Sequence, residues 1–203
     1  MITLTELQTD ALAEMFNVGA GHAAASLSEI VGDEVLLSIP RIAFCGRDEL
    51  GTSLALLRSE RLGAVRQDFS GAFAVNASLL FTEDKALEIV HEMLGSQVSV
   101  DDLPEFEQEA MCELGNIILN ACMASISEML DVEMTSTLPQ YIVNRTETVL
   151  HELTSDMQQP VVLVLHIDLT IEKRETHGAL VFLLSSASFH DLIAAVDRFL
   201  ARI

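Results

Sequence analysis

The sequence predicts an α/β protein in which helices pack against a central, largely antiparallel sheet, with two related halves about a pseudo-two-fold axis. Three observations support this fold class. Half of the residues are hydrophobic, which is ample for one core. Segments with apolar residues at helical spacing alternate with short, nearly continuous apolar runs that are typical of strands buried on both faces. One motif also occurs twice, so we expect a single domain over residues 1–203, made of halves 1–100 and 101–203.

Each half is expected to open with a long helix, Thr3–Val31 in the first and Leu103–Leu130 in the second. Asp101 or Asp102 is expected to cap the second helix. The next elements follow in the same order in both halves. Strands are expected at Glu34–Pro40, Gly63–Phe69, Ala72–Phe81, Val132–Pro139, Val161–Glu172 and Gly178–Ser185. Shorter helices are expected at Asp48–Leu57, Glu83–Leu94, Thr146–Met157 and Ser188–Ala201.

The composition excludes several classes of function. The 31 acidic and 11 basic residues give a formal net charge of −20, which opposes binding to nucleic acid or to an anionic membrane surface. We see no apolar run of the roughly 20 residues that span a bilayer and no signal-peptide pattern. The three cysteines are odd in number and widely spaced, as in reduced cytoplasmic proteins. We therefore expect a cytoplasmic protein that binds no nucleic acid and does not insert into a membrane.

The few basic residues are unevenly distributed. None precedes Arg41, and none lies between Lys85 and Arg145. The segments in these two gaps should build a surface of negative potential, and a partner that carries Lys or Arg would complement it. The alternative interpretation is a pair of solvated acidic helices that only maintain solubility.

The repeated motif lies at a constant offset of 99 residues. Asp10–Asn17 aligns with Glu109–Asn116, and Pro40 aligns with Pro139. A weaker similarity relates Gly71 to Gly178 at an offset of 107, which predicts about eight extra residues near positions 154–159. Two copies are too few for a solenoid, so a duplication around one shared core is the better interpretation.

On each opening helix the motif residues fall in one narrow polar stripe, which we expect to be exposed. The stripe of the first helix contains Asp10, Glu14, Asn17 and Gly21, and that of the second contains Glu109, Glu113, Asn116 and Asn120. In each stripe a carboxylate and a carboxamide stand one turn apart. Gly19 and Gly21 beside the first amide fit either the close approach of a partner or close packing against another helix, and the sequence leaves both open.

The paired carboxylate and carboxamide suggest chemistry that is performed on a partner. A carboxamide can orient a water molecule, and a carboxylate can bind a cationic group through a charge-assisted hydrogen bond. His22 aligns with Ala121, so a duplicated mechanism cannot depend on that histidine. The six histidines show no metal-ligand spacing, and no metal site is expected. An isolated pair of this kind is most often a solvated helix face, but its repetition at one offset argues against that interpretation.

The pattern [D/E]-x3-E-x2-N-x22-P, present in both halves, resembles that of the CheC/CheX/FliY family of bacterial chemotaxis phosphatases. The similarity extends from about Thr3 to the end of the chain, and two copies without an appended domain resemble the CheC-type members. Asn17-Val-Gly-Ala-Gly-His-Ala-Ala is close to the family's N-I-G-A-G-N-A-A stretch. Phe16 and His22 depart from residues that are frequent in the family, whereas Gly115 keeps the frequent glycine before the second amide.

This resemblance implies dephosphorylation of a CheY-like response regulator. Glu14 and Glu113 would pair with the regulator's lysine, and Asn17 and Asn116 would position the attacking water. The regulator would supply the phosphoaspartate and its Mg²⁺, so the chain itself needs no cofactor. The remaining stripe residues would form a docking surface; they are Asp10, Glu109, Gly21 and Asn120.

Two alternatives to catalysis follow from the same residues. The chain could be a non-catalytic adaptor that binds CheY or the deamidase CheD, or a flagellar switch component, with its helices serving only for docking. It could also be a plain structural domain, which would leave the polar stripes unexplained. Intact Glu/Asn pairs in both halves favour the phosphatase.

Overall fold

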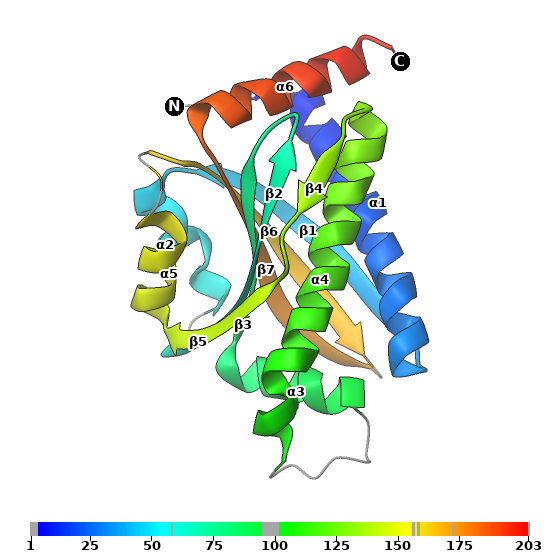
Figure 1. Ribbon diagram of the computed structural model, residues 1–203, viewed down its shortest axis with the longest axis vertical. Helices are drawn as coiled ribbons and strands as arrows, with labels where there is room; N and C mark the ends of the chain where they lie inside the picture. The colour runs from blue at the N-terminus through cyan, green and yellow to red at the C-terminus, as the bar shows by residue number, and fades with distance from the viewer. Residues whose placement is uncertain are drawn as a thin grey trace.

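The computed structural model describes residues 4–57, 59–94, 102–155, 157, 159–171 and 173–202. Three positions named in the expected elements, Thr3, Asp101 and Glu172, lie outside these residues. The predicted α/β class is confirmed: a curled antiparallel sheet is packed by helices (Figure 1).

Seven strands form the sheet in the order β1-β6-β7-β3-β2-β4, and β5 also pairs with β2. The strands are β1 Val35–Cys45, β2 Arg61–Gly71, β3 Val75–Thr82, β4 Met134–Ser136, β5 Gln140–Arg145, β6 Val161–Ile171 and β7 Arg174–Leu184. The two hairpins, β2–β3 of the first half and β6–β7 of the second, lie in the centre of the sheet. The first strand of each half pairs with the hairpin of the other half: β1 with β6, and β4 and β5 with β2. This exchange joins the two halves in one sheet; the duplication itself stays a prediction.

The helices cover both faces of the sheet. They are α1 Glu6–Val31, α2 Leu50–Ser53, α3 Glu83–Leu94, α4 Leu103–Leu130, α5 Thr146–Ser155 and α6 Ser186–Leu200, with short 3-10 turns at Arg47–Glu49 and Ala55–Leu57. The main apolar cluster joins α1, α3, α4 and α6 to one face of the sheet, and a smaller cluster joins α2 and α5 to the other. Burial on both faces explains the continuous apolar runs of β6 and β7.

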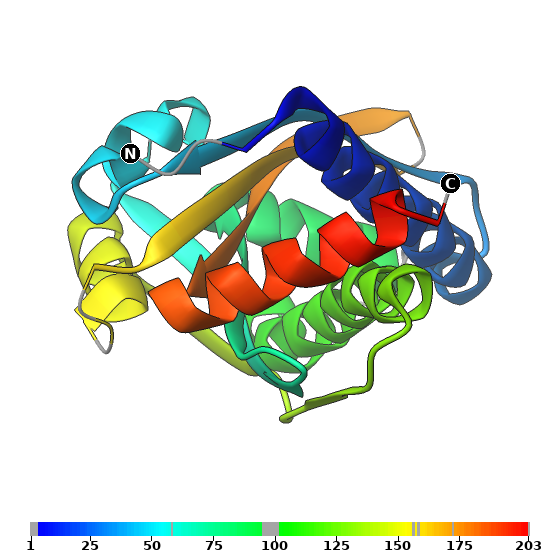
Figure 2. The ribbon, with the colours of Figure 1, turned by 90° about the horizontal axis from the view of Figure 1, so that it is seen from above.

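Helices α1 and α4 lie side by side and run in opposite directions, as their colour gradients show (Figures 1 and 2). Helix α6 crosses their ends at the top of Figure 1, and the Gln8 side chain on α1 donates to Asp197 on α6 at 2.7 Å. The polar stripes predicted from the motif therefore lie on neighbouring helices of one layer.

The edge strands differ from the prediction. The first was expected to end at Pro40, but β1 continues to Cys45, and its register to β6 shifts between Ser38 and Arg41. An edge strand tolerates such an irregularity because one side of its ladder is unpaired. In the second half the corresponding segment is broken into β4 and β5 on either side of Pro139.

The weaker similarity at offset 107 was wrong as a structural alignment. Gly71 ends β2, whereas Gly178 lies inside β7. The two hairpins begin at Arg61 and Val161, which are 100 residues apart. This offset is close to that of the motifs, so the second half has no eight-residue insertion before its hairpin.

Helix α4 bears on the expectation that the chain has no apolar run long enough to span a bilayer. It is the one described helix that is long and apolar enough, by length and composition alone, to cross a membrane. In its most apolar window 56% of the residues are buried inside the fold. Its apolar character is therefore explained by its packing against α1 and against the sheet.

Candidate functional site

The stripe on α1 is exposed. Asp10, Glu14, Asn17 and Gly21 all face solvent, while Met15 and Phe16 between them are buried. The helix starts at a capping box in which the Thr5 hydroxyl accepts from the Gln8 backbone N–H, and the Gln8 side chain accepts from the Thr5 N–H. This well-defined start and the buried side of the helix fix the direction in which the stripe points.

The stripe on α4 is exposed at one end and partly covered at the other. Glu109 and Glu113 face solvent, whereas Asn116 and Asn120 are half-buried. The expectation that both motif amides are exposed therefore holds for Asn17 and is wrong for Asn116. The difference arises because the β4–β5 segment passes beside this part of α4.

The acidic side chains of both stripes are available to a cation. Within the described residues, Asp10, Glu14, Glu109 and Glu113 take part in no ion pair. Each helix thus presents two unpaired carboxylates one turn apart, and an approaching lysine or arginine would meet them without displacing an internal partner.

Asn120 contacts other polar groups instead of facing a partner. Its Nδ2 donates to Oδ1 of Asn116 and to the backbone carbonyl of Asn116, both at 2.8 Å, and lies 3.3 Å from Oε1 of Gln67. Its Oδ1 accepts from the Ser136 hydroxyl at 3.1 Å. The sequence placed Asn120 in the docking surface and missed Gln67 and Ser136, which are distant in the chain. The available signal for Gln67 was strand alternation, which places this polar residue on the same buried face of β2 as Val65 and Phe69.

The two glycines of α1 have different surroundings. A Cβ on Gly19 would stand 2.6 Å from the Cα of Cys122 on α4, so this glycine lets the two helices pack closely. A Cβ on Gly21 would meet nothing within 4 Å. The packing interpretation is correct for Gly19, and Gly21 leaves open space beside Asn17.

The residues before the two amides also differ. Phe16 is 1% exposed, and its ring lies 5.0 Å from that of Phe182 on β7. Gly115 is buried, and a Cβ there would stand 2.3 Å from a methyl carbon of Val65 on β2. Helix α1 therefore contacts the sheet through a large side chain at this position, and α4 through a glycine. The departure from the family at Phe16 affects only the core and leaves Asn17 exposed.

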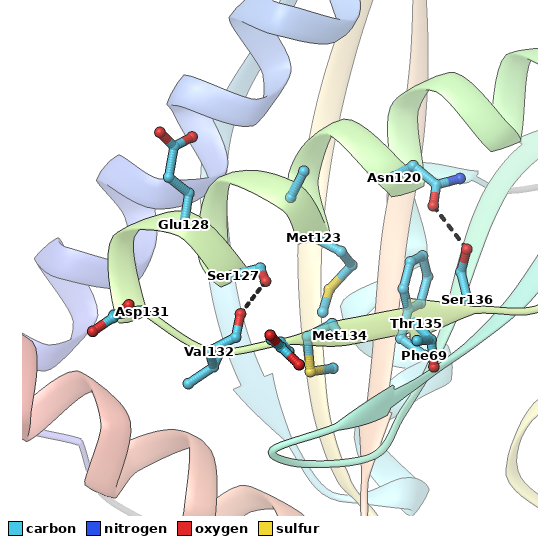
Figure 3. Close-up of a pocket in the computed structure, with 12 residues that line it drawn as sticks. Phe69, Asn120, Met123, Ser127, Glu128, Asp131, Val132, Met134, Thr135 and Ser136 are labelled. Atoms are coloured by element: carbon cyan, nitrogen blue, oxygen red, sulfur yellow. Dashed lines mark hydrogen bonds between the residues drawn. The ribbon is translucent and has the colours of Figure 1, made fainter.

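Two adjoining grooves flank the second stripe. One of about 610 Å³ contains Asn116, Asn120 and Ser26 of α1. The other, of about 770 Å³, lies between the C-terminal half of α4 and β4 (Figure 3). Asn120 and Ser136 contribute to both grooves, and in Figure 3 they point toward one another across the gap. The amide of Asn116 is thus reached from an open surface.

One group of possible metal ligands lies in the described residues, away from both stripes. One ligand atom each of Asp168, Glu175 and His177 falls within 4.8 Å of the others. Nδ1 of His177 is 2.7 Å from a carboxylate oxygen of Asp168, so these two side chains already satisfy one another. The three cysteines are free thiols, and burial raises the pKa of Cys122 to about 12.

No model of a known protein family matches the sequence. A curated relative, the CheY-P phosphatase CheC of Bacillus subtilis, is 20% identical over 164 residues, which is 77% of this chain and 76% of the relative. FliY of Thermotoga maritima is 18% identical with a TM-score of 0.75, over 98% of this chain and 100% of that one. The chain therefore has the fold of FliY and CheX, and its sequence is similar to that of CheC.

Two further solved structures share the CheC-type fold. The CheX–CheY–BeF3–Mg complex of Borrelia burgdorferi matches with a TM-score of 0.54 at 12% identity, over 85% of this chain and 97% of that one. The FliG–FliM complex of H. pylori matches with a TM-score of 0.66, also at 12% identity, over 94% of this chain and 100% of that one. At such identities these structures establish the fold alone.

Proposed function

We propose that the chain is a protein phosphatase that accelerates loss of the aspartyl phosphate from a CheY-like response regulator. The observation that carries the proposal is the pair of motif helices, each with an unpaired glutamate one turn before an asparagine on an accessible surface. The similarity to the CheY-P phosphatase CheC supports this activity, and the likeness to CheX in a complex with CheY supports the partner.

In this mechanism the glutamate binds the regulator, and the asparagine orients the attacking water. Glu14 or Glu113 forms a charge-assisted hydrogen bond with a lysine of the regulator, which fixes the docked geometry. Asn17 or Asn116 then holds a water molecule in line with the phosphorus–oxygen bond of the acyl phosphate. The water oxygen bonds to phosphorus while the bond to the aspartate oxygen breaks, releasing phosphate and the free carboxylate. The regulator brings the Mg²⁺ that neutralises the phosphoryl oxygens.

The decisive experiment measures phosphate release from a phosphorylated CheY-like regulator. We expect Asn17→Ala with Asn116→Ala to return the rate to that of the regulator alone, a loss of about 100-fold or more in the catalysed rate. Glu29→Gln with Glu128→Gln is the matched control, because these exposed acids lie on the same helices outside the stripes. Undiminished phosphate release in the double asparagine variant would refute the mechanism.

A non-catalytic docking role is the second candidate. It is favoured by the likeness to FliM in its complex with FliG, whose TM-score of 0.66 exceeds the 0.54 of CheX in its complex with CheY. This candidate predicts that the chain binds a regulator or another chemotaxis protein such as CheD while phosphate release from the regulator stays at its own rate. Binding and release measured in parallel on the same samples separate the two candidates.

A further inference from the structure

We propose that Asn120 is a positioning residue for Asn116, so that the amide of the second site is oriented before a partner docks while that of the first site is free. This inference rests on the proposed function, which it deepens by making the two sites unequal. It is carried by a chain of hydrogen bonds that begins inside the sheet and ends at the Asn116 side chain.

The first link is Gln67 on β2, whose side chain is 2% exposed and faces α4. Its Nε2 donates to the backbone carbonyl of Thr137 at 2.7 Å. That carbonyl can only accept, so it fixes which end of the Gln67 amide is the donor. Oε1 of Gln67 is thereby directed toward Asn120, where it presents an acceptor.

The second link is Asn120 itself. Its Nδ2 faces three oxygen acceptors: Oε1 of Gln67, and the backbone carbonyl and Oδ1 of Asn116. Its Oδ1 faces the hydroxyl of Ser136, which can donate. Turning the Asn120 amide over would place an oxygen against all three acceptors, which is strongly unfavourable in a half-buried site. The orientation of Asn120 is therefore fixed by its neighbours.

The fixed orientation of Asn120 in turn orients the Asn116 amide. Because its Oδ1 accepts from Asn120, its Nδ2 is turned away from Asn120 and keeps its donors for another group. A water that accepts from this Nδ2 retains a lone pair for attack on phosphorus. Restricting the side chain before docking removes part of the ordering cost of the bound state, so we expect a gain of about 3- to 10-fold in kcat.

In the part of the chain that the structure describes, the first site has no corresponding chain of hydrogen bonds. Gly21 occupies the position that aligns with Asn120, and the buried Ile167 lies in β6 where the offset of 100 residues places the counterpart of Gln67. Within the described residues, no hydrogen bond restrains the Asn17 side chain. Its amide has to be ordered when the regulator docks, so the second site should be the faster one.

The test uses the full chain with Asn17→Ala, in which only the second site works, and compares it with the same chain carrying Asn120→Asp. The aspartate keeps the acceptor for Ser136 but replaces the donor to Asn116 by an oxygen. We expect kcat for phosphate release to fall about 3- to 10-fold with KM unchanged. As a control for the added charge, Asn144→Asp on β5 in the same Asn17→Ala chain should leave kcat unchanged, because its side-chain oxygen still accepts from the Arg145 backbone N–H.

Side-chain amide signals in ¹⁵N NMR provide a readout that does not depend on activity. The Asn116 NH₂ signals should shift and exchange faster with solvent in the Asn120→Asp chain, while its melting temperature stays within a few degrees of the parent. Unchanged Asn116 signals would overturn the proposal, and so would shifted signals with an unchanged kcat. If the parent chain releases no phosphate, the proposed function fails instead, and the NMR comparison still decides whether Asn120 orients Asn116.

Discussion

Gly19 and Gly21 are two positions apart on α1, yet a methyl group would have opposite effects on stability at the two sites. Gly19→Ala places a Cβ 2.6 Å from the Cα of Cys122, so α1 and α4 must separate, and we expect a loss of about 1–3 kcal/mol in the free energy of unfolding. Gly21→Ala meets open space and gains helix propensity, so we expect a gain of about 0.5–1 kcal/mol. Urea unfolding followed by circular dichroism measures both, and equal effects would contradict the packing assignment.

His166 makes stability depend on pH. It is 5% exposed, and burial, followed by the charge of Arg41, lowers its pKa below the usual 6.5, although Asp168 partly opposes the shift. The unfolded chain therefore binds the proton at a higher pH than the folded chain. The contribution to stability is complete above the unfolded value and is lost progressively as the pH falls below about 6.5.

Replacement of this histidine should flatten that dependence. We expect His166→Gln to show a smaller loss of unfolding free energy than the parent between pH 7 and pH 5. Urea titrations at four or five pH values in this interval measure the difference. Parallel curves for the two proteins would show that His166 does not contribute.

At the residue scale the sequence was sufficient where a property follows from helical spacing. The two Glu/Asn pairs could be placed on one helix face because 3.6 residues per turn determines which side chains share that face. The partial burial of Asn116 could not be found in this way. It depends on Gln67 and Ser136, and their position beside α4 follows from strand pairing between distant parts of the chain.

At the scale of elements, the two motif helices begin differently. Thr5 caps α1 through its side chain, whereas Asp102 occupies the N-cap position of α4 without a side-chain hydrogen bond to the helix. We expect Thr5→Ala to lower the free energy of unfolding by about 1 kcal/mol and Asp102→Ala to lower it by less. Thermal or urea unfolding of the two variants checks this. A larger effect at Asp102 would contradict the cap assignment.

The regular elements were predictable because their signals are local. Both long helices, the central strands and the closing helices lie close to the expected ranges, since apolar spacing and helix breakers determine them. The edge strands were not, because nothing local distinguishes the irregular β1 from the broken β4 and β5. The alignment of Gly71 with Gly178 failed for a related reason: two short Gly-Ala sequences look alike whether they end a strand or lie inside one.

At the scale of the whole molecule, the net charge of −20 should govern association with a cationic partner. We expect the affinity for a phosphorylated CheY-like regulator to fall roughly tenfold between low salt and about 0.5 M salt, because screening shortens the range of the attraction. Fluorescence or calorimetric titration measures this. Glu14→Gln with Glu113→Gln should give a shallower salt dependence, and an affinity that does not change with salt would contradict docking through these carboxylates.

The architecture followed from the repeat, but the way in which the halves combine did not. Two similar sequences predict two similar arrangements of helices and strands. They do not specify that β1 pairs with β6 and that β4 and β5 pair with β2. That exchange is selected by burial of both sheet faces in one structure, which is a property of the complete chain.

The contacts of Phe16 and Gly115 imply that α1 and α4 cannot replace one another in this fold. A phenylalanine at position 115 would collide with Val65, and a glycine at position 16 would leave a cavity beside Phe182. A chimera with α1 in both places would overfill one side of the core, and one with α4 in both places would underfill the other. Each motif helix is thus complementary to its own part of the sheet.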